Sequence, residues 1–184
     1  MAIRYDKINL SDLGVRAEVA RFDARGEVTE WHVMLHVEPR CDLFQKQMQR
    51  IYEAEDRLTG MPGFEGSRYV MKRYFLSDST NQQPLMRKQP DISISIIQQQ
   101  PLDGSKIAVW LYMQSHTQVA NENGMVVVSH NGYRHLWKMG MHQHKDDSAW
   151  QTESVLIEYE EALQNFGATL ADNCVRPWFF VRDV

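Results

Sequence analysis

The sequence predicts an α+β protein in which a sheet carries helices on one face, and in which this unit occurs twice, the second time incompletely. Three observations lead to this prediction. Several segments alternate apolar and polar residues, as strands with one buried face do. Two longer segments repeat apolar residues at helical spacing. The chain also resembles itself when it is shifted by 105 positions, which indicates an internal duplication.

Composition allows one ordinary core or two small ones, because 43% of the 184 residues are hydrophobic and 24% are charged. A formal net charge of -4 gives no basic stripe for a phosphate backbone, so we expect no nucleic-acid partner. Cys41 and Cys174 are isolated, and the start "MAIRYDKINL" lacks the pattern of a signal peptide, which favours a reducing, cytoplasmic location. The apolar run "GMVVVSHNG" is too short to cross a bilayer, so no membrane partner is expected.

Strand signals occupy most of the chain. Residues 14–38 predict a hairpin, because two alternating segments flank "ARGE", whose Gly26 suits a turn. "SRYVMKRYFLSD" predicts a single strand, and "DISISIIQQQ" and "SKIAVWLYMQ" predict a pair that meets across the turn signal "PLDGS". Residues 124–142 predict another hairpin around His130-Asn131-Gly132, and "WFFV" predicts an apolar terminal strand.

Two helices are expected. The first runs from an N-cap at Asp42 to Gly60 and Pro62, which end it. The second follows Asp147 or Ser148 and ends at Gly167, and its apolar stripe is the stronger of the two. The residues of this second stripe are Val155, Leu156, Tyr159, Ala162, Leu163 and Phe166.

The self-similarity extends over a helix and the strands around it. A shift of 105 positions places "IYEAEDRL" on "LIEYEEAL" and "WHVMLHV" on "LWKMGMH". The first copy continues through residues 79–113, which supply a closing strand pair, whereas the second reaches Val184 without one. We therefore expect a divergent domain at 1–115, the N-terminal part of a second domain at 116–184, and a chain that is a fragment or a truncated product. The alternative is a two-layer protein whose second half completes the first.

Three short motifs carry a resemblance to a known family. They are the helix opening Gln151-Thr152, the turn Gly167-Ala168-Thr169 and the strand end Val181-Arg182-Asp183. With these motifs residues 124–184 resemble the RidA family, also called YjgF or L-PSP endoribonuclease-like, and "DISISIIQQQPLDGSKIAVWLYM" looks like its closing strand pair. The resemblance implies a chorismate-mutase-like fold, a trimer or pseudo-trimer and ligand clefts between subunits. The tandem arrangement is similar to that of chorismatases.

Many members of this family hydrolyse reactive enamine or imine intermediates. The chemistry needs an Arg that binds the substrate carboxylate and an acidic group that positions water. This sequence has Ile92 and Ser93 where the resemblance places the Arg, and Ala108 where it places the acid. The leading interpretation is a RidA-like protein that binds a small carbonyl, imine or carboxylate metabolite, and in its complete form is an imine or enamine deaminase or a chorismatase-like hydrolase. The alternative is a non-catalytic RidA-like module for oligomerisation or partner binding. No cofactor is implied.

The candidate ligand site lies in the second copy. Met139-Gly140-Met141 looks like the counterpart of the family's Ser-Gly-Gln ligand loop, and a Gly there permits close backbone approach of a ligand or, alternatively, forms a β-bulge. Nearby histidines suggest a metal, but their spacing matches no closed zinc pattern, so no metal is expected. The predicted ligand-binding residues are Met139, Gly140, Met141 and His135.

Two further sets of residues are expected to have ordinary structural roles. His32 and His36 lie four positions apart on a predicted strand and hence on one face of it. Trp110 and Trp178 lie in apolar strand segments, so both are expected in the core.

Overall fold

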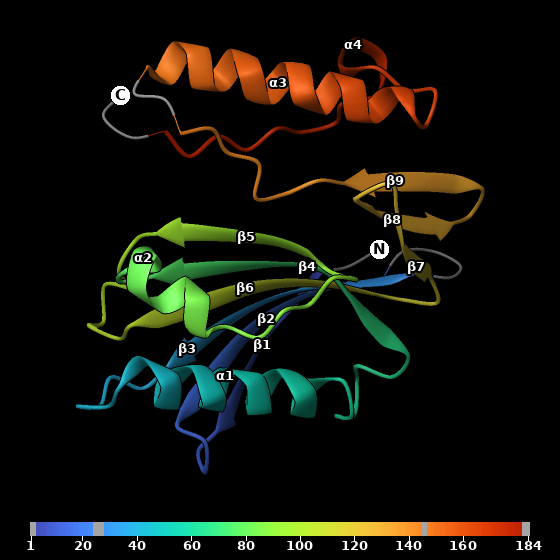
Figure 1. Ribbon diagram of the computed structural model, residues 1–184. Helices are drawn as coiled ribbons and strands as arrows, with labels where there is room; N and C mark the ends of the chain where they lie inside the picture. The colour runs from blue at the N-terminus through green and yellow to red at the C-terminus, as the bar shows by residue number, and fades with distance from the viewer. Residues whose placement is uncertain (1–2, 24–27, 145–146, 182–184) are drawn as a thin grey trace. The chain divides into compact units, whose positions relative to one another are not determined.

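The computed structural model describes residues 3–23, 28–144 and 147–181 (Figure 1). They form two compact units, Met1–Trp137 (unit 1) and Lys138–Val184 (unit 2), each described here by itself. The predicted α+β class is confirmed, since the chain contains a mixed sheet, an antiparallel sheet and helices. The predicted boundary between residues 115 and 116 concerns a duplication of sequence and stays a prediction.

Unit 1 contains two sheets. The larger has the order β1-β2-β3-β6-β4-β5, in which β4 and β5 are parallel and all other neighbours are antiparallel. Its strands are β1 (Ile3–Leu10), β2 (Val15–Asp23), β3 (Thr29–Val37), β4 (Ser67–Leu76), β5 (Ser93–Gln98) and β6 (Ile107–Ser115). The smaller sheet is an antiparallel meander. Its strands are β7 (Gln118–Glu122), β8 (Met125–His130) and β9 (Tyr133–Trp137).

The helices divide between the units. Unit 1 has α1 (Phe44–Leu58), α2 (Ser79–Gln82) and the 3-10 helix η1 (Gln83–Leu85), and unit 2 has α3 (Ser148–Gln164) and α4 (Leu170–Asn173). The two predicted helices correspond to α1 and α3. None of the helices in the described part of the chain is long and apolar enough to span a membrane.

Helix α1 packs on one face of the larger sheet, as Figure 1 shows. The sheet face toward α1 is apolar because alternate residues of each strand point to it, such as Trp31, Val33 and Leu35 of β3. They pack with Met48 and Ile51 of α1 in one core. The opposite face of the larger sheet, called the far face below, holds the intervening residues of the same strands.

The predicted pairing of "DISISIIQQQ" with "SKIAVWLYMQ" is wrong. Strand β6 lies between β3 and β4, and β5 pairs in parallel with β4 at the edge of the sheet. Burial explains this order: eight of the nine residues of β6 are buried, which suits a central strand, whereas β5 ends in an exposed residue. The turn signal "PLDGS" therefore belongs to a connection that passes from one side of β4 to the other.

The predicted terminal strand is also wrong over its described residues. Residues 174–181 have no regular secondary structure, and Trp178, predicted to be in the core, is 53% exposed. Pro177 lacks the N–H that a strand ladder needs, which disfavours pairing here. Strands β1 and β7 were not predicted from the sequence. Most of their residues are exposed, so the alternation that marks a half-buried strand is weak in both.

Local signals at the hairpins and helix ends were more reliable. The β2–β3 and β8–β9 hairpins are confirmed, and Asn131 and Gly132 take the positive φ angles of a tight turn. Gly26 lies outside the described residues. Asp147 caps α3 by accepting a hydrogen bond from the Ala149 N–H at 2.9 Å. The cap predicted at Asp42 is wrong, because Asp42 pairs instead with Arg50 at 2.9 Å and Leu43 takes the N-cap position.

The relative strength predicted for the two helical stripes is reversed. Helix α1 buries eight residues, and Leu163 is the buried residue of α3. The packing of α1 against a broad sheet accounts for the difference, since a helix stripe becomes a core only where a second apolar surface covers it.

A buried ion pair joins α1 to the sheet. Lys72 of β4 donates to Glu55 of α1 at 2.7 Å and to Gln89 at 2.6 Å, and the two charged side chains are 2% and 0% exposed. Tyr74 donates to the other oxygen of Glu55 at 3.2 Å and accepts from Gln89 at 3.1 Å. Burial raises the pKa of Glu55, and the Lys72 ammonium acts against this rise. The charges are therefore matched by partners inside the core.

Replacing Lys72 with Met should destabilise the protein by about 3 kcal/mol, because the Glu55 carboxylate then stays buried with only the partly exposed Arg87, 3.6 Å away, as a cation. The pKa of Glu55 should rise further in this variant. A carboxyl whose pKa is raised on folding loses its contribution to stability as the pH rises through the folded-state pKa. The loss of unfolding free energy relative to the wild type, measured in urea, should therefore grow from mildly acidic to mildly alkaline pH. Lys46→Met, at an exposed position of α1, is the control. A small deficit that is independent of pH would contradict this role.

Candidate functional site

A row of polar and aromatic side chains crosses the far face on three neighbouring strands. Strand β6 contributes Trp110, Tyr112 and Gln114, because alternate residues of a strand share a face. On β3, His32 is the cross-strand neighbour of Tyr112, and Glu30 is that of Gln114. On β4, Arg73 is the cross-strand neighbour of Trp110. We call these six residues the far-face row.

At one end of the row a cation and an imidazole flank an indole. The guanidinium of Arg73, a residue that is 5% exposed, lies 5.1 Å from the ring centre of Trp110. Trp110 donates from Nε1 to Nδ1 of His32 at 3.1 Å. Because an indole N–H can only donate, Nδ1 of His32 must be unprotonated and its proton must reside on Nε2. Removal of water from the ring lowers the pKa of His32, which the Glu30 carboxylate partly offsets.

Tyr112 occupies the middle of the row. Its ring stacks on His32 with centroids 4.8 Å apart. Its hydroxyl donates to Oε2 of Glu30 at 2.8 Å and accepts from Nε2 of Gln114 at 2.6 Å. Burial and the Glu30 carboxylate both raise the pKa of Tyr112, so the phenol keeps its proton. The Tyr112 hydroxyl thus fixes both the Glu30 carboxylate and the Gln114 amide.

The β8–β9 hairpin reaches the same row. The Trp137 ring of β9 lies 5.1 Å from the Tyr112 ring, on which His32 also packs. His130 and His135 meet edge to face at 4.9 Å. Loss of water and the neighbouring His130 lower the pKa of His135, and Glu30 acts in the opposite direction. Residues from both sheets of unit 1 therefore surround Glu30 and Tyr112.

An open groove of about 430 Å³ adjoins the Trp110 end of the row. It lies over β1, β2, β3 and β6 and includes His32 and Trp110 in its lining. Lys7 and Glu18 line it as well, and their charged groups lie 3.6 Å apart. A small molecule in this groove would contact the imidazole and the indole directly.

The far-face row can therefore supply three kinds of interaction. Arg73 provides a positive charge that attracts a carboxylate. His32 provides a neutral imidazole whose Nε2–H can donate to a carbonyl oxygen or an imine nitrogen. Glu30 provides a carboxylate that can accept a hydrogen bond from water. Since Glu30 and Arg73 are two strands apart, His32 and Tyr112 lie between them.

The predicted ligand-binding residues fall in both units. His135 is on β9 in unit 1, next to His130. Met139, Gly140 and Met141 are in unit 2, in the segment that connects β9 with α3 and has no regular secondary structure. Gly140 has a φ of +71°, which a Gly adopts most easily, and its carbonyl lies 2.8 Å from Nδ1 of His142. The alternative of a β-bulge is wrong, because β9 already ends at Trp137.

The histidines form pairs rather than a larger group. His142 and His144 meet at 4.8 Å between ring centroids, as His130 and His135 do at 4.9 Å. Asp146, close to them in sequence, lies outside the described residues. Across the described ranges, no group of three or more His, Cys, Asp or Glu side chains is arranged to hold a metal ion.

Sequence reasoning missed most of the far-face row. His32 and His36 share a face as predicted, but His32 has aromatic partners that its strand alone could not indicate. The prediction that Trp110 lies in the core is wrong, because it is partly exposed on the far face and contacts His32. The usable signal was the alternation "AVWLYMQ", which places Trp110, Tyr112 and Gln114 on one face of β6.

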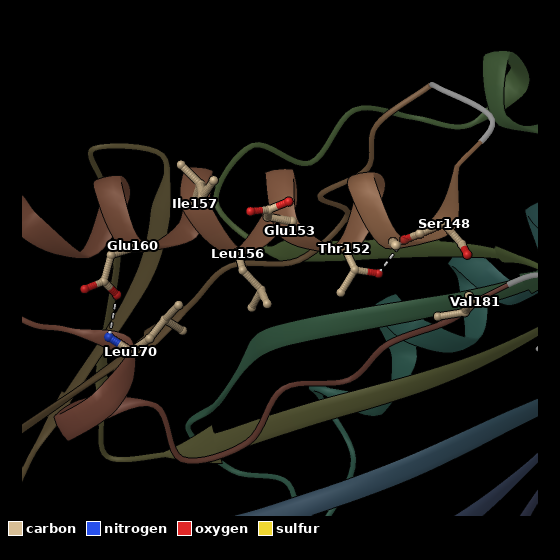
Figure 2. A pocket seen from close by; sticks show the side chains of 9 residues that line it. Ser148, Thr152, Glu153, Leu156, Ile157, Glu160, Leu170 and Val181 are labelled. Atoms are coloured by element: carbon tan, nitrogen blue, oxygen red, sulfur yellow. Dashed lines mark hydrogen bonds between the residues drawn. The ribbon is translucent and has the colours of Figure 1, made fainter.

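Unit 2 has a groove of its own, about 640 Å³ in volume, between α3 and residues 170–181 (Figure 2). Figure 2 shows Leu156 and Leu170 in its lining, together with polar groups that already have partners. Glu160 accepts from the Leu170 N–H at 2.6 Å, and Thr152 donates to the Ser148 carbonyl at 2.8 Å. The groove thus offers apolar surface and little directed polar chemistry, so the far-face row is the better candidate site.

Trp110→Phe tests the contact that sets the tautomer of His32. The variant keeps an aromatic ring but removes the N–H that stabilises neutral His32, so the pKa of His32 should rise and its Nδ1-protonated tautomer should appear. Proton–nitrogen correlation spectra of the imidazole rings measure both changes, and His36 on the same strand is the internal control. Unchanged His32 signals would show that the hydrogen bond has no effect in solution.

No family model, curated protein or solved structure matches the chain. The function is therefore inferred from the residues themselves, their contacts and the resemblance of their motifs.

Proposed function

We propose that the chain is a RidA-like protein that binds a small carbonyl, imine or carboxylate metabolite at the Trp110 end of the far-face row. One observation carries the proposal. Arg73, His32 and Glu30 share one face of one sheet, with the aromatic side chains of β6 between the cation and the carboxylate, so both groups that imine hydrolysis needs border the same row. They do so without the Arg and the acid at the positions that the resemblance implies.

The roles of these residues follow from their chemistry. Arg73 attracts the carboxylate of the ligand, and the Nε2–H of His32 donates to its carbonyl oxygen or imine nitrogen. For hydrolysis, a water molecule adds to the C=N carbon. The C–N bond then breaks, ammonia departs, and the carbon keeps the oxygen of the water as a carbonyl. Glu30 is the group that would hold this water, because its carboxylate already accepts from the Tyr112 hydroxyl and has a second oxygen.

The order of elements supports the RidA-like and duplicated parts of the proposal. Strands β1, β2 and β3 form an antiparallel meander that leads into α1, and β7, β8 and β9 form another that leads into α3. The same succession at two places is what a duplicated unit predicts. Arg73 also lies close to the positions that the resemblance assigns to the Arg and the acid. On its face of β4 it is flanked by Met71 and Phe75. Met71 is the cross-strand neighbour of Ser93, and Phe75 is that of Ala108.

A second candidate function is a RidA-like module that binds or oligomerises without turnover. The absence of a charged side chain at Ser93 and Ala108 favours it. In this case the far-face row holds a metabolite as a ligand only. The trimer or pseudo-trimer that the resemblance implies is part of both proposals, and light scattering on the purified chain measures it.

Titration with 2-oxobutyrate tests metabolite binding, because this ligand joins a carbonyl to a carboxylate. We expect His32→Ala to weaken binding about tenfold, since a hydrogen bond to a polarised ligand is lost. Arg73→Met should weaken it at least as much. His36→Ala, on the same strand and the same face, should bind like the wild type. Calorimetry gives the affinities, and equal affinity of His32→Ala and the wild type would refute the proposed site.

Turnover separates the two candidate functions. With 2-iminopropionate as substrate, ammonia release that Glu30→Gln abolishes would favour the hydrolase. Binding of 2-oxobutyrate without release of ammonia from 2-iminopropionate would favour the module.

A further inference from the structure

Strand β1 forms an open edge of the larger sheet. Its eight residues pair with β2 in one continuous register, and in the described part of the chain no strand pairs with its other side. A strand at a sheet edge presents backbone N–H and C=O groups that a further strand can pair with. The opposite edge strand, β5, is shorter and more buried, and Ser79 of α2 donates to its Gln98 at 2.7 Å. Of the two edges, β1 is therefore the more accessible.

The β1 edge carries exposed apolar side chains. Ile3 is 56% exposed and Tyr5 is 78% exposed. Tyr5 is the cross-strand neighbour of Ala20, which in turn is that of His32, so Tyr5 lies on the far face. Tyr5 also lines the open groove together with His32 and Trp110. A strand that paired with β1 would therefore cover apolar surface and reach the rim of this groove.

The charges of β1 select one way in which two copies of the strand can pair. In an antiparallel pair of identical strands, opposite residues share a face, so the two-fold axis must pass between two copies of the same residue. An axis at Arg4, Asp6 or Lys7 sets like charges opposite each other, which is destabilising. An axis at Ile8 or beyond gives no ion pair. An axis at Tyr5 sets Arg4 of each copy opposite Asp6 of the other, which gives two ion pairs.

We propose that β1 pairs with β1 of a second copy of this chain about an axis at Tyr5. The two Tyr5 rings meet on the far face, and Ile3 of each copy lies opposite the aliphatic stem of Lys7. On the other face, Arg4 and Asp6 form the ion pairs between the copies. Backbone hydrogen bonds supply the affinity of such a strand addition, and the charges fix its register. We call this contact the β1 pairing.

The β1 pairing has two expected properties. Only residues 3–7 of each strand lie opposite each other, so the association should be weak and depend on concentration. It is a two-fold contact, and it is therefore separate from the threefold assembly that the resemblance implies. The pairing itself does not depend on the proposed function. A consequence that does rest on that function is that the partner's Tyr5 adds a second aromatic ring beside the groove where the metabolite is proposed to bind.

Cysteine substitutions along β1 test the register on the full chain, with Cys41 and Cys174 replaced by Ser. Opposite Cα atoms in an antiparallel pair lie about 4.5–5.5 Å apart, within the span of a disulfide. Tyr5 is the position that faces its own copy. Under mild oxidation, Tyr5→Cys should therefore form a disulfide-linked dimer about tenfold faster than Ile3→Cys or Lys7→Cys. Gel electrophoresis without reductant measures these rates.

A mixture of two variants is the internal control for thiol exposure. Ile3→Cys and Lys7→Cys should each cross-link slowly alone, but an equimolar mixture of the two should cross-link fast, because these positions face each other in the β1 pairing. A difference in exposure or reactivity of the thiols could not produce this pattern, since the same two variants are compared alone and together.

Charge reversal tests the β1 pairing with Tyr5 in place. Arg4→Asp sets two carboxylates opposite each other, so the concentration at which the particle mass doubles should rise about tenfold. Adding Asp6→Arg exchanges the charges and should restore association to near the wild-type level. Lys46→Asp, the same change of charge at an exposed position of α1, is the matched control and should associate like the wild type. Sedimentation velocity over a concentration series measures the mass.

Two results would overturn the β1 pairing. One is cross-linking of Tyr5→Cys that is no faster than that of Ile3→Cys, or that is slower than that of Lys7→Cys, because either would exclude an axis at Tyr5. The other is an Arg4→Asp variant that associates as the wild type does. Neither measurement uses a metabolite, so failure of the β1 pairing and failure of the proposed metabolite site are distinguishable.

Discussion

The position of β6 between β3 and β4 is the constraint on which the rest of unit 1 depends. This strand makes both halves of the larger sheet continuous, since it is the hydrogen-bonded neighbour of each. It also has two different faces. Val109, Leu111 and Met113 belong to the core that α1 shares, while Trp110, Tyr112 and Gln114 form the centre of the far-face row. One strand thus supplies the packing of one face and the chemistry of the other.

The two faces treat their polar groups in opposite ways. Toward α1, Lys72 and Glu55 are matched by each other and by Tyr74 and Gln89, so the cost of desolvation is partly offset within the core. On the far face, His32 and Trp110 line an open groove. A satisfied buried network stabilises a fold, whereas polar and aromatic side chains that line a groove can contact a ligand. This contrast is why we assign structure to the first face and binding to the second.

Sequence reasoning succeeded where the signal is local. The β8–β9 hairpin has its Asn131-Gly132 turn, α3 has its Asp147 cap, and α1 has apolar spacing over four turns. It failed where strands distant in sequence must be ordered. The signal at "PLDGS" predicts a turn but cannot tell whether β6 returns beside β5 or passes β4 to pair with β3. The far-face row joins β3, β4 and β6, so its membership could not be predicted without that order.

Tyr112 connects the two ends of the far-face row. Its ring lies against both His32 and Trp137, while its hydroxyl is fixed between Glu30 and Gln114. Because its pKa is raised, the phenol keeps the single proton that orients both of these groups over the whole neutral range. The orientation of the Gln114 amide and the position of the Glu30 carboxylate therefore have the same origin. A ligand at either end meets side chains whose orientation is already set before it binds, which lowers the entropic cost of recognition.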